Sequence, residues 1–237
     1  MKVAVLNFSG NVGKTTVAAH LLKPRMGDAP IFSVESLNVD ASDNGIDVEK
    51  LRGSRYKELT DQLMHLDSAI IDVGASNVEE FLKLMQRYSS SHEEFDYFVV
   101  PVVKERKQQV DTMNTIRALA ELGIPKNKIR LVFNKVDTND SIEEDFTHIF
   151  GYAEAEDSFV IDPAASIHFN EVFDELKAIG ISFSQVNADP VDYRAKLRTL
   201  TDQAERERCV LMVGIKRLAV TANKNLDTVH TALFAQS

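Results

Sequence analysis

The fold of this 237-residue chain is decided by its first stretch, Lys2-Val3-Ala4-Val5-Leu6-Asn7-Phe8-Ser9-Gly10-Asn11-Val12-Gly13-Lys14-Thr15-Thr16. The stretch begins as a short apolar strand, continues as a glycine-containing loop and ends in Lys-Thr-Thr, and a helix-forming segment follows at residues 17–22. Glycines let a backbone wrap closely around phosphate groups, and the N–H groups of such a loop and of the following helix point at them. This order of strand, loop, Lys-Thr and helix predicts a binding site for a nucleoside triphosphate.

Each polar position of the loop has an expected part in that site. Lys14 would neutralise the β- and γ-phosphate oxygens and is the first candidate catalytic residue, whereas Thr15 would give its hydroxyl to Mg²⁺. The expected nucleotide-binding residues of the loop are Gly10, Asn11, Val12, Gly13, Lys14, Thr15 and Thr16. The full motif has a glycine five residues before Gly13, where this chain has Phe8. The alternative interpretation is an ordinary glycine turn before a helix.

Composition indicates a globular protein of a reducing compartment. The chain is 44% hydrophobic and 27% charged, which is typical of globular domains, and its length suits one large α/β domain or one domain with an added helical piece. Cys209 is the only cysteine, so a disulfide framework and a cysteine-based metal site are excluded. The sequence has neither the features of a signal peptide nor the ~18 consecutive apolar residues of a membrane span. We expect a cytoplasmic protein without a membrane span.

Charge is distributed unevenly along the chain. Residues 188–237 hold eight Lys or Arg and six Asp or Glu, a net charge of +2; because the whole chain carries −9, residues 1–187 carry −11. We expect a nucleotide-binding α/β domain over residues 1–187 and a helical extension over residues 188–237, packed on the same domain. The acidic body argues against broad coating of nucleic acid and leaves room for a local basic patch, for which a solvated helix face is the alternative.

Strand-like and helix-like segments alternate along most of the chain. Apolar, β-branched runs predict further strands at residues 30–35, 68–74, 95–102, 129–134 and 158–161. Pro101 is expected to close the strand at residues 95–102. Helical spacing predicts helices at residues 55–66, 77–88, 107–122 and 167–179, and more helices from Pro190 onward, the last at about 226–235. The pattern is typical of an α/β fold with a doubly wound, mainly parallel sheet and helices on both faces.

Polar side chains follow four of the predicted strands at the point where each strand ends. They belong to the loop at residues 8–16, to Glu35, to Asp72 and to Asn134. Right-handed crossovers bring the carboxyl ends of parallel strands to one edge of a sheet, and ligands bind at that edge. We therefore expect these four groups to lie close together in one site.

Two carboxylates at that edge have a chemical interpretation. Asp72 follows the run Ala69-Ile70-Ile71 and takes the position of a carboxylate that holds the shell of Mg²⁺, usually through water. Glu35 is the second candidate catalytic residue, because a carboxylate there can order the attacking water or join the Mg²⁺ shell. The structural alternatives are a helix cap for Asp72 and a solvated loop acid for Glu35.

The sequence Asn134-Lys135-Val136-Asp137 predicts a pocket for a purine. An Asn amide can read the edge of a purine ring, and the residues that follow can flank the ring. As letters, the same four residues match the Asn-Lys-x-Asp guanine motif, in which the Asp accepts hydrogen bonds from the guanine ring. The pattern therefore favours a purine and leaves adenine and guanine open.

These motifs together resemble the deviant Walker-A ATPases of the ParA/MinD group, in order and spacing over roughly residues 1–180. The resemblance rests on residues 9–16, 34–35, 70–72, 99–101 and 132–134. Within the group the chain looks most like the StbB plasmid-stability proteins, which accompany plasmid segregation and conjugation functions. The resemblance implies ATP and Mg²⁺ at the loop, nucleotide-dependent self-association and a DNA-bound adaptor protein as partner. It assigns Lys14 and Thr15 to the phosphates and Mg²⁺, Asp72 to the metal shell and Asn134 to adenine.

Two positions depart from the pattern of that group. The group has a lysine at the second loop position that reaches the nucleotide of the partner subunit, and this chain has Ser9 there. The Asp-x-Asp of its second strand is not preserved either, since Glu35 replaces one aspartate and the other is Ser33 or Leu37, depending on the alignment. Both departures concern hydrolysis and the nucleotide-sandwich dimer rather than binding.

The leading expectation is a cytoplasmic ATP-binding switch or weak ATPase that acts in plasmid partition, stability and positioning. It would bind ATP and ADP, work with a DNA-bound adaptor and associate weakly with itself, with direct DNA contact left open. Three alternatives remain: a GTP-binding protein of related fold, a small-molecule kinase or ATP-dependent synthetase, and a nucleotide-independent adaptor with a relic loop.

Overall fold

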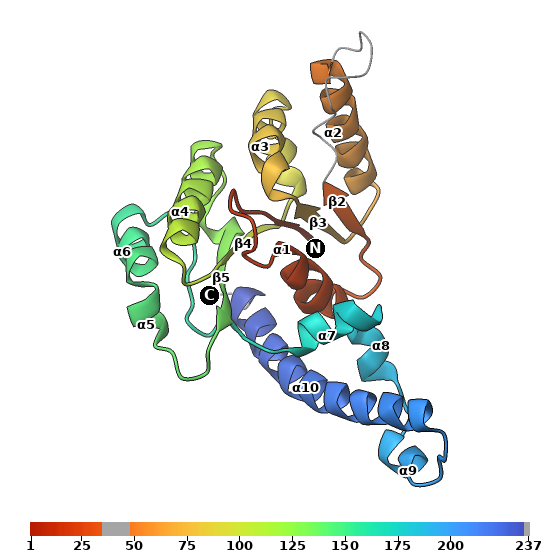
Figure 1. Cartoon of the computed structure of the whole chain (residues 1–237). Coiled ribbons are helices and arrows are strands. Elements are labelled where there is room, and N and C mark those ends of the chain that lie inside the picture. The colour runs from red at the N-terminus through yellow and green to blue at the C-terminus, as the bar shows by residue number, and fades with distance from the viewer. Residues whose placement is uncertain (35–47, 235–237) are drawn as a thin grey trace.

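The computed structural model describes residues 1–34 and 48–234, which form one parallel sheet flanked by helices (Figure 1). Within these residues the sheet has six strands in the order β2-β3-β1-β4-β5-β6. The strands are β1 (Lys2–Val5), β2 (Ile31–Val34), β3 (Ala69–Val73), β4 (Tyr97–Val102), β5 (Ile129–Val136) and β6 (Ser166–His168). All of these pairings are parallel. The doubly wound α/β fold predicted from the sequence is confirmed, and β1 lies in the interior of the sheet.

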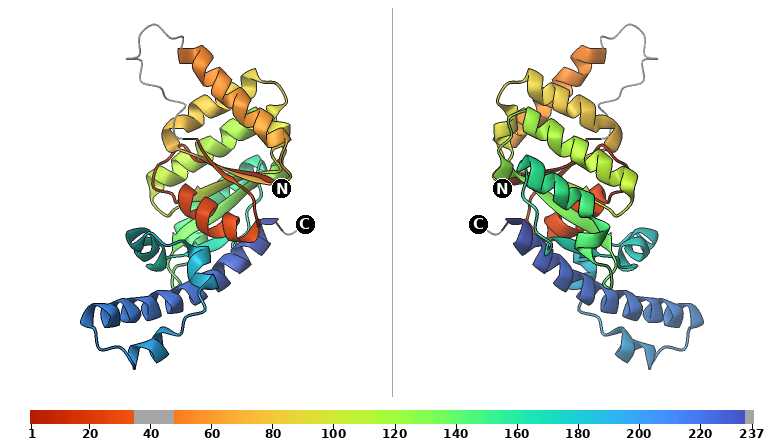
Figure 2. Two further views of the ribbon diagram at one scale, coloured as in Figure 1. Left: turned by 90° about the vertical axis from the view of Figure 1, so that its right-hand side faces the viewer. Right: turned by 90° about the vertical axis from the view of Figure 1, so that its left-hand side faces the viewer.

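Helices cover both faces of the sheet (Figure 2). Because successive side chains of a strand point to opposite faces, Ala4 and Leu6 pack on one side and Val3 and Val5 on the other. The first side is covered by α2 (Val48–Met64), α3 (Val78–Arg87), α4 (Arg106–Glu121) and α6 (Thr147–Glu156). The second side is covered by η1 (Val17–Leu22), α7 (Val172–Ile179), α8 (Phe183–Ala188) and α10 (Gln203–Phe234).

The remaining elements are short. They are α1 (Lys14–Thr16), η2 (Lys23–Arg25), η3 (Ala75–Asn77), η4 (Ser91–Glu94), η5 (Lys126–Lys128), α5 (Ile142–Asp145) and α9 (Tyr193–Leu197). The helix-forming segment predicted after the loop is found as α1 and η1. The helices predicted at residues 55–66, 77–88 and 107–122 correspond to α2, α3 and α4, of which α2 begins seven residues earlier. The segment between β5 and β6, for which no helix is predicted, contains α5 and α6.

The sixth strand lies elsewhere than predicted. Residues 158–161 contribute a single bridge, between Val160 and Arg130, and the strand beside β5 is Ser166–His168. The helix expected at residues 167–179 therefore begins only at Val172. The physical reason is local, because the side-chain oxygen of Asn170 accepts a hydrogen bond from the backbone N–H of Val172 (3.0 Å) and starts the helix there.

Proline does not close β4 as predicted. Pro101 is buried inside the strand and is in register with Val132 of β5. Pro101 has no N–H to donate, but the pairing with β1 does not need one there. That pairing ends at Val99, because the chain leaves the sheet after β1 and continues as the loop. A proline at this place is compatible with a central strand.

From Pro190 onward the described residues form the short α9 and one long helix, α10. The helix predicted at about residues 226–235 is the last part of α10, which begins at Gln203 and has 32 residues. Its buried stripe consists of Cys209, Met212, Ile215, Ala219, Ala222, Leu226, Val229 and Leu233. Val210 and Leu211, next to the first residue of this stripe, are 58% and 44% exposed. Gly214 does not interrupt the helix because neighbouring turns on the stripe are packed.

The two halves of α10 have different surroundings. Leu226, Val229 and Leu233 share a core with Val3, Val132 and Ile167 of the sheet. The first half of α10 extends away from the sheet together with α9 (Figure 1). No helix within residues 1–34 and 48–234 is long and apolar enough to cross a membrane.

Candidate functional site

The loop that follows β1 is anchored by a buried asparagine. Asn7 is 0% exposed, and its side-chain N–H groups donate to the carbonyl of Pro101 (2.8 Å) and to the hydroxyl of Thr112 (2.7 Å). Its side-chain oxygen accepts from the N–H of Ser9 (2.7 Å). The next helix adds a second tie, because Thr115 of α4 accepts from the N–H of Phe8 (3.0 Å). The start of the loop is thereby fixed to β4 and α4.

Lys14 begins α1 and points back into the loop. Its ammonium group donates to the carbonyls of Ser9 (2.7 Å) and Asn7 (3.2 Å), and the residue is only 8% exposed. Burial lowers the pKa of Lys14, and the negative charge of Asp72 opposes that effect. The loop thus holds a cation whose present partners are neutral backbone carbonyls, and phosphate oxygens would be stronger partners for it.

Thr15 and Asp72 meet across the carboxyl edge of the sheet. The hydroxyl of Thr15 donates to the carboxylate of Asp72 at 2.8 Å, although 57 residues separate them in the sequence. Asp72 lies in β3, which pairs directly with β1, so the sheet register brings the two together. Thr15 and Asp72 are the two residues that the sequence motifs predict for the shell of Mg²⁺.

The chemistry of this pair fits Mg²⁺. Mg²⁺ binds hard oxygen ligands, keeps several waters, and needs only one or two protein groups beside the phosphates of its nucleotide. A hydroxyl and a carboxylate at hydrogen-bonding distance supply such a set. The described residues contain no cluster of three or more His, Cys, Asp or Glu side chains that could hold a metal by themselves. If Mg²⁺ binds, Thr15 and Asp72 are therefore the groups that would hold it, together with phosphate oxygens and water.

Asn134 holds the loop by a hydrogen bond from its side chain. It lies near the end of β5, is 3% exposed, and donates from its side-chain nitrogen to the carbonyl of Val12 (2.9 Å). Gly13 has φ +89°, and a Cβ atom at that position would stand 1.9 Å from the side-chain nitrogen of Asn134. The loop passes so close to Asn134 that only glycine fits at residue 13.

The structure brings together most of the predicted site. The loop residues Gly10 to Thr16, Asp72 and Asn134 lie at the carboxyl edge, as expected from the parallel sheet. Asn134 faces the loop backbone, so its role toward adenine stays a prediction. Asp137 is exposed and accepts hydrogen bonds from the backbone and side chain of Asn139 (3.0 and 3.2 Å). Glu35, the second candidate catalytic residue, lies outside the described residues.

Four polar side chains at the site have no role in the predictions from the sequence. One is Asn7, although an amide directly after an apolar run and before a glycine loop is a signal for an anchored loop. Thr112 and Thr115 lie three residues apart on the buried face of α4, and this spacing is a second signal. His20, on η1, adjoins the site and had no sequence signal of its own.

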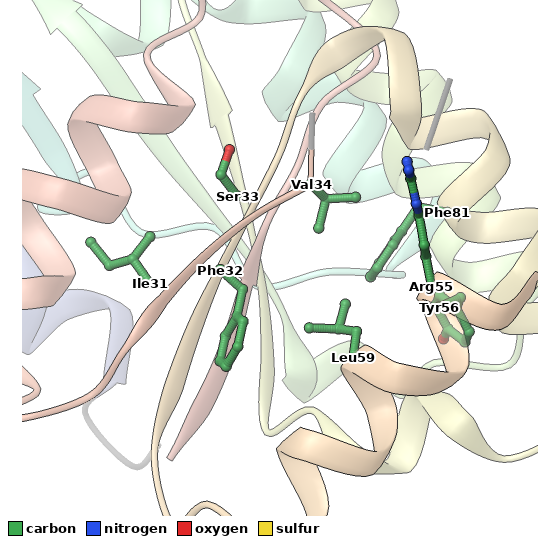
Figure 3. A pocket seen from close by; sticks show the side chains of 8 residues that line it. All are labelled: Ile31, Phe32, Ser33, Val34, Arg55, Tyr56, Leu59 and Phe81. Atoms are coloured by element: carbon green, nitrogen blue, oxygen red, sulfur yellow. The ribbon is translucent and has the colours of Figure 1, made fainter. Parts of the chain in front are cut away.

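An apolar cavity of ~350 Å³ lies away from this loop, between β2 and α2 (Figure 3). Phe32 and Val34 of β2 face Leu59 of α2 there, with Phe81 of α3 beside them (Figure 3). Ser33, Arg55 and Tyr56 also line it, and none of the loop residues does.

Replacing Asp72 by alanine is expected to flatten the response of nucleotide binding to Mg²⁺. The carboxylate acts through the ion, whereas without metal it only repels a triphosphate, so metal-free affinity should stay equal or rise. Titrations of the D72A variant and of the parent protein, each with Mg²⁺ and with a chelator, measure the effect. An equal loss of affinity in both conditions would contradict the metal role.

Solved structures with a similar fold include McdA and MinD proteins. An ATP complex of McdA from Cyanothece is 15% identical, with a TM-score of 0.51 over 93% of this chain and 96% of that one. The cell division ATPase MinD of Pyrococcus furiosus is 15% identical, with a TM-score of 0.52 over 92% and 98%. The MinD cell division protein of Aquifex aeolicus is 12% identical, with a TM-score of 0.51 over 93% and 97%.

These similarities establish the fold. No protein-family model and no curated protein matches the sequence. The chain therefore shares the fold of the McdA and MinD structures, at identities too low to carry more than the fold.

Proposed function

We propose that this chain is an ATP-binding switch with weak intrinsic ATPase activity that serves the partition, stability and positioning of plasmid DNA in the cytoplasm, in the manner of the StbB proteins. The observation that carries the proposal is the contact of the Thr15 hydroxyl with Asp72 (2.8 Å) beside the loop that contains Lys14. Cation, metal-shell pair and glycine loop then act together on the phosphates. A DNA-bound adaptor of the same plasmid system would be the partner, and the predicted extension at residues 188–237 would offer it a surface.

The structural neighbours support ATP as the ligand. One of them is an ATP complex of McdA, and the two MinD proteins are cell division proteins, one of them described as an ATPase. The guanine alternative needs Asn134 and Asp137 free to read the base. In this structure Asp137 accepts hydrogen bonds from Asn139, which counts against guanine, whereas the hydrogen bond of Asn134 to the carbonyl of Val12 bears equally on both purines.

Titration of the purified chain with labelled ATP, ADP and GTP, with and without Mg²⁺, tests the proposal. We expect ATP and ADP to bind, ATP more tightly with Mg²⁺, and GTP more weakly. Preferential GTP binding would establish the GTP-binding alternative, and turnover that depends on a metabolite would establish the kinase or synthetase. A folded chain that binds no nucleotide would contradict the proposal and leave a nucleotide-independent adaptor.

Restoring a lysine at residue 9 is expected to raise turnover. Ser9 has no charge to place on a partner's nucleotide, and a cation aimed at the charge that develops on a transferred phosphoryl group is worth orders of magnitude in rate. Wild-type hydrolysis should therefore be slow, with only a weak effect of ATP on the monomer–dimer balance. The S9K variant should gain rate, dimer or both in turnover assays and ultracentrifugation. Brisk hydrolysis and complete ATP-driven dimerisation by the wild type would contradict this argument.

Direct binding of duplex DNA is expected to be weak and steeply dependent on salt. Arg194, Lys196 and Arg198 of the α9 region and Arg208 of α10 are exposed, whereas Arg206 is engaged with the carbonyls of Leu197 (3.0 Å) and Leu200 (2.9 Å). Four phosphate contacts would give a slope of log affinity against log salt of about −3.6. Fluorescence anisotropy between roughly 50 and 200 mM salt measures this slope. An affinity that does not change with salt concentration would show that these residues form a solvated helix face only.

A further inference from the structure

A groove of ~390 Å³ lies between the start of α9 and one face of α10, in the part of the chain that extends away from the sheet (Figure 1). Its volume lies within the range of binding sites for small groups, which is roughly 300 to 1,000 Å³. Its apolar lining comes from three valines, Val191, Val213 and Val220. None of the loop residues 8–16 lines the groove, so it is a site separate from the phosphate loop.

The residue pattern of α10 explains why apolar side chains line this groove. Val213, Arg217 and Val220 recur at steps of four and three residues, so they share one face of the helix. Met212 and Ala219 of the buried stripe each precede a valine of this face by one residue, which is a rotation of about 100° around the helix axis. The helix therefore has a second, partly apolar face beside the one that packs on the rest of the protein.

The valines of the groove are exposed, unlike those of the sheet. Val191 is 41% and Val220 is 56% exposed, whereas Val3 and Val5 of β1 are fully buried. Of the eight large hydrophobic side chains that are exposed among the described residues, four lie on α10 or directly before α9; they are Val191, Val210, Leu211 and Val220. Exposed apolar side chains that gather in one place, with polar groups around them, mark a surface that binds a partner.

Hydrogen bonds hold the two walls of the groove together. The ammonium group of Lys216 donates to the carbonyls of Asp189 (2.6 Å) and Val191 (2.8 Å) and lies 5.1 Å from the ring centroid of Tyr193. The carboxylate of Asp192 accepts from two backbone N–H groups at the start of α9, both at 3.0 Å. The groove is thus preformed, which lowers the cost of ordering that binding would otherwise have.

Two further cations line the groove and are not used in this way. Arg194 and Arg217 are exposed, and within the described part of the chain neither donates a side-chain hydrogen bond or forms an ion pair. The charged residues of the lining are Arg194, Lys216 and Arg217 against Asp192, a net charge of +2. The groove therefore combines an apolar lining with an excess of positive charge.

A protein segment with both apolar side chains and carboxylates matches this lining. Duplex DNA would bring phosphates to the two arginines, but its backbone has no apolar group for the valines. A wholly apolar segment would leave the positive charge of the groove without a counterpart. An amphipathic helix laid into a groove presents both kinds of side chain at the required spacing.

We propose that the groove between α9 and α10 binds an acidic, amphipathic segment of the partner protein, with apolar side chains against the valines and carboxylates at Arg194 and Arg217. The inference deepens the proposed function and rests on it for the partner, because the DNA-bound adaptor is the protein that would carry the segment. Binding of such a segment needs no nucleotide, so it can be measured apart from the phosphate loop.

Peptides selected from a display library test the assignment. Random peptides long enough for about four helical turns are first depleted on an immobilised R217E/V220D variant and then selected on the full wild-type chain. This variant reverses one charge and places a carboxylate among the valines, and both side chains are exposed. K107E/V110D is the matched control, because Lys107 and Val110 are also exposed and also three residues apart, on α4. Circular dichroism confirms that both variants are folded.

We expect the selected peptides to be rich in apolar residues and to carry a net negative charge. In fluorescence anisotropy, R217E/V220D should bind such a peptide at least about tenfold more weakly than the wild type, because an apolar contact is lost and a repulsive charge is added. K107E/V110D should bind it like the wild type. The same peptide with Gln and Asn in place of Glu and Asp should bind the wild type severalfold more weakly.

Three results overturn the assignment: no peptide is selected, the selected peptides are neutral or basic, or R217E/V220D binds them as tightly as the wild type. If no peptide is selected and R217E/V220D loses affinity for duplex DNA instead, the groove is part of a DNA surface. ATP titration of R217E/V220D should match the wild type, because no loop residue lines the groove. A chain that binds ATP and no such peptide leaves the proposed switch standing, whereas one that binds the peptides and no nucleotide leaves only the groove.

Discussion

Replacing Lys14 by alanine is expected to lower the affinity for ATP by about two to four orders of magnitude and to leave the chain folded. Lys14 is placed to give two charge-assisted hydrogen bonds to phosphate oxygens, and each such bond is worth ~1.5–3 kcal/mol. The loss of ~3–6 kcal/mol corresponds to that change in affinity. Inorganic tripolyphosphate, which has the phosphates without the nucleoside, uses the same bonds and should lose affinity to the same degree.

The fold should survive because the contacts of Lys14 lie within the loop. Within the described part of the chain its ammonium group donates to the carbonyls of Asn7 and Ser9, and Asn7 keeps its own bonds to Pro101 and Thr112 without it. Burial lowers the pKa of Lys14, so giving up this desolvated charge offsets part of the loss of its two hydrogen bonds. Thermal unfolding followed by circular dichroism checks this point.

Lys23 provides a matched control for this experiment. Its ammonium group also donates to two backbone carbonyls, those of Ala29 (2.8 Å) and Gly27 (3.2 Å), close to the distances found for Lys14. It lies at the far end of the same helical segment and away from the loop. The K23A variant should keep its affinity for ATP. Equal affinity of the K14A variant and the wild type would remove the phosphate site from this loop.

The sequence predicts those parts of the site whose positions follow from the topology of the sheet. Their positions do not depend on how side chains pack. A parallel sheet brings the end of β1 next to the end of β3 whatever the loops do, so Thr15 and Asp72 could be expected to meet. The fold class followed from the same alternation of strands and helices. Glycine and lysine of the loop were recognisable because their chemistry is local.

Other features depend on contacts between segments far apart in the sequence. Asn134 reads as a base-recognition residue in its own motif, and only the path of the loop shows that Val12 and Gly13 lie against it. The strand Ser166–His168 is three residues long, too short for a period of two to separate it from a helix start. The single helix α10 could not be predicted, because the two halves of its apolar stripe pack against different elements.

Replacing Gly13 by alanine is expected to cost the chain about 3 kcal/mol of stability and to abolish nucleotide binding. Gly13 has φ +89°, and a side chain in the left-handed region costs ~1–2 kcal/mol. The new Cβ atom would also stand 1.9 Å from the side-chain nitrogen of Asn134, so that group must move. Its bond to the carbonyl of Val12 would break, and a buried amide left without a partner costs a further ~1–3 kcal/mol.

A double-mutant cycle separates the two causes of this loss. Asn134→Ala alone removes the support of the loop and the group that the new Cβ strikes, so Gly13→Ala should cost less in the N134A background, down to the ~1–2 kcal/mol of backbone strain. Gly10→Ala is the control in the same loop, because a Cβ atom there meets nothing within 4 Å and the backbone is outside the left-handed region. Chemical denaturation of the four chains of the cycle and of the G10A variant gives the free energies of unfolding. Strictly additive effects of residues 13 and 134 would show that the close approach of Asn134 to the loop is not what requires glycine at residue 13.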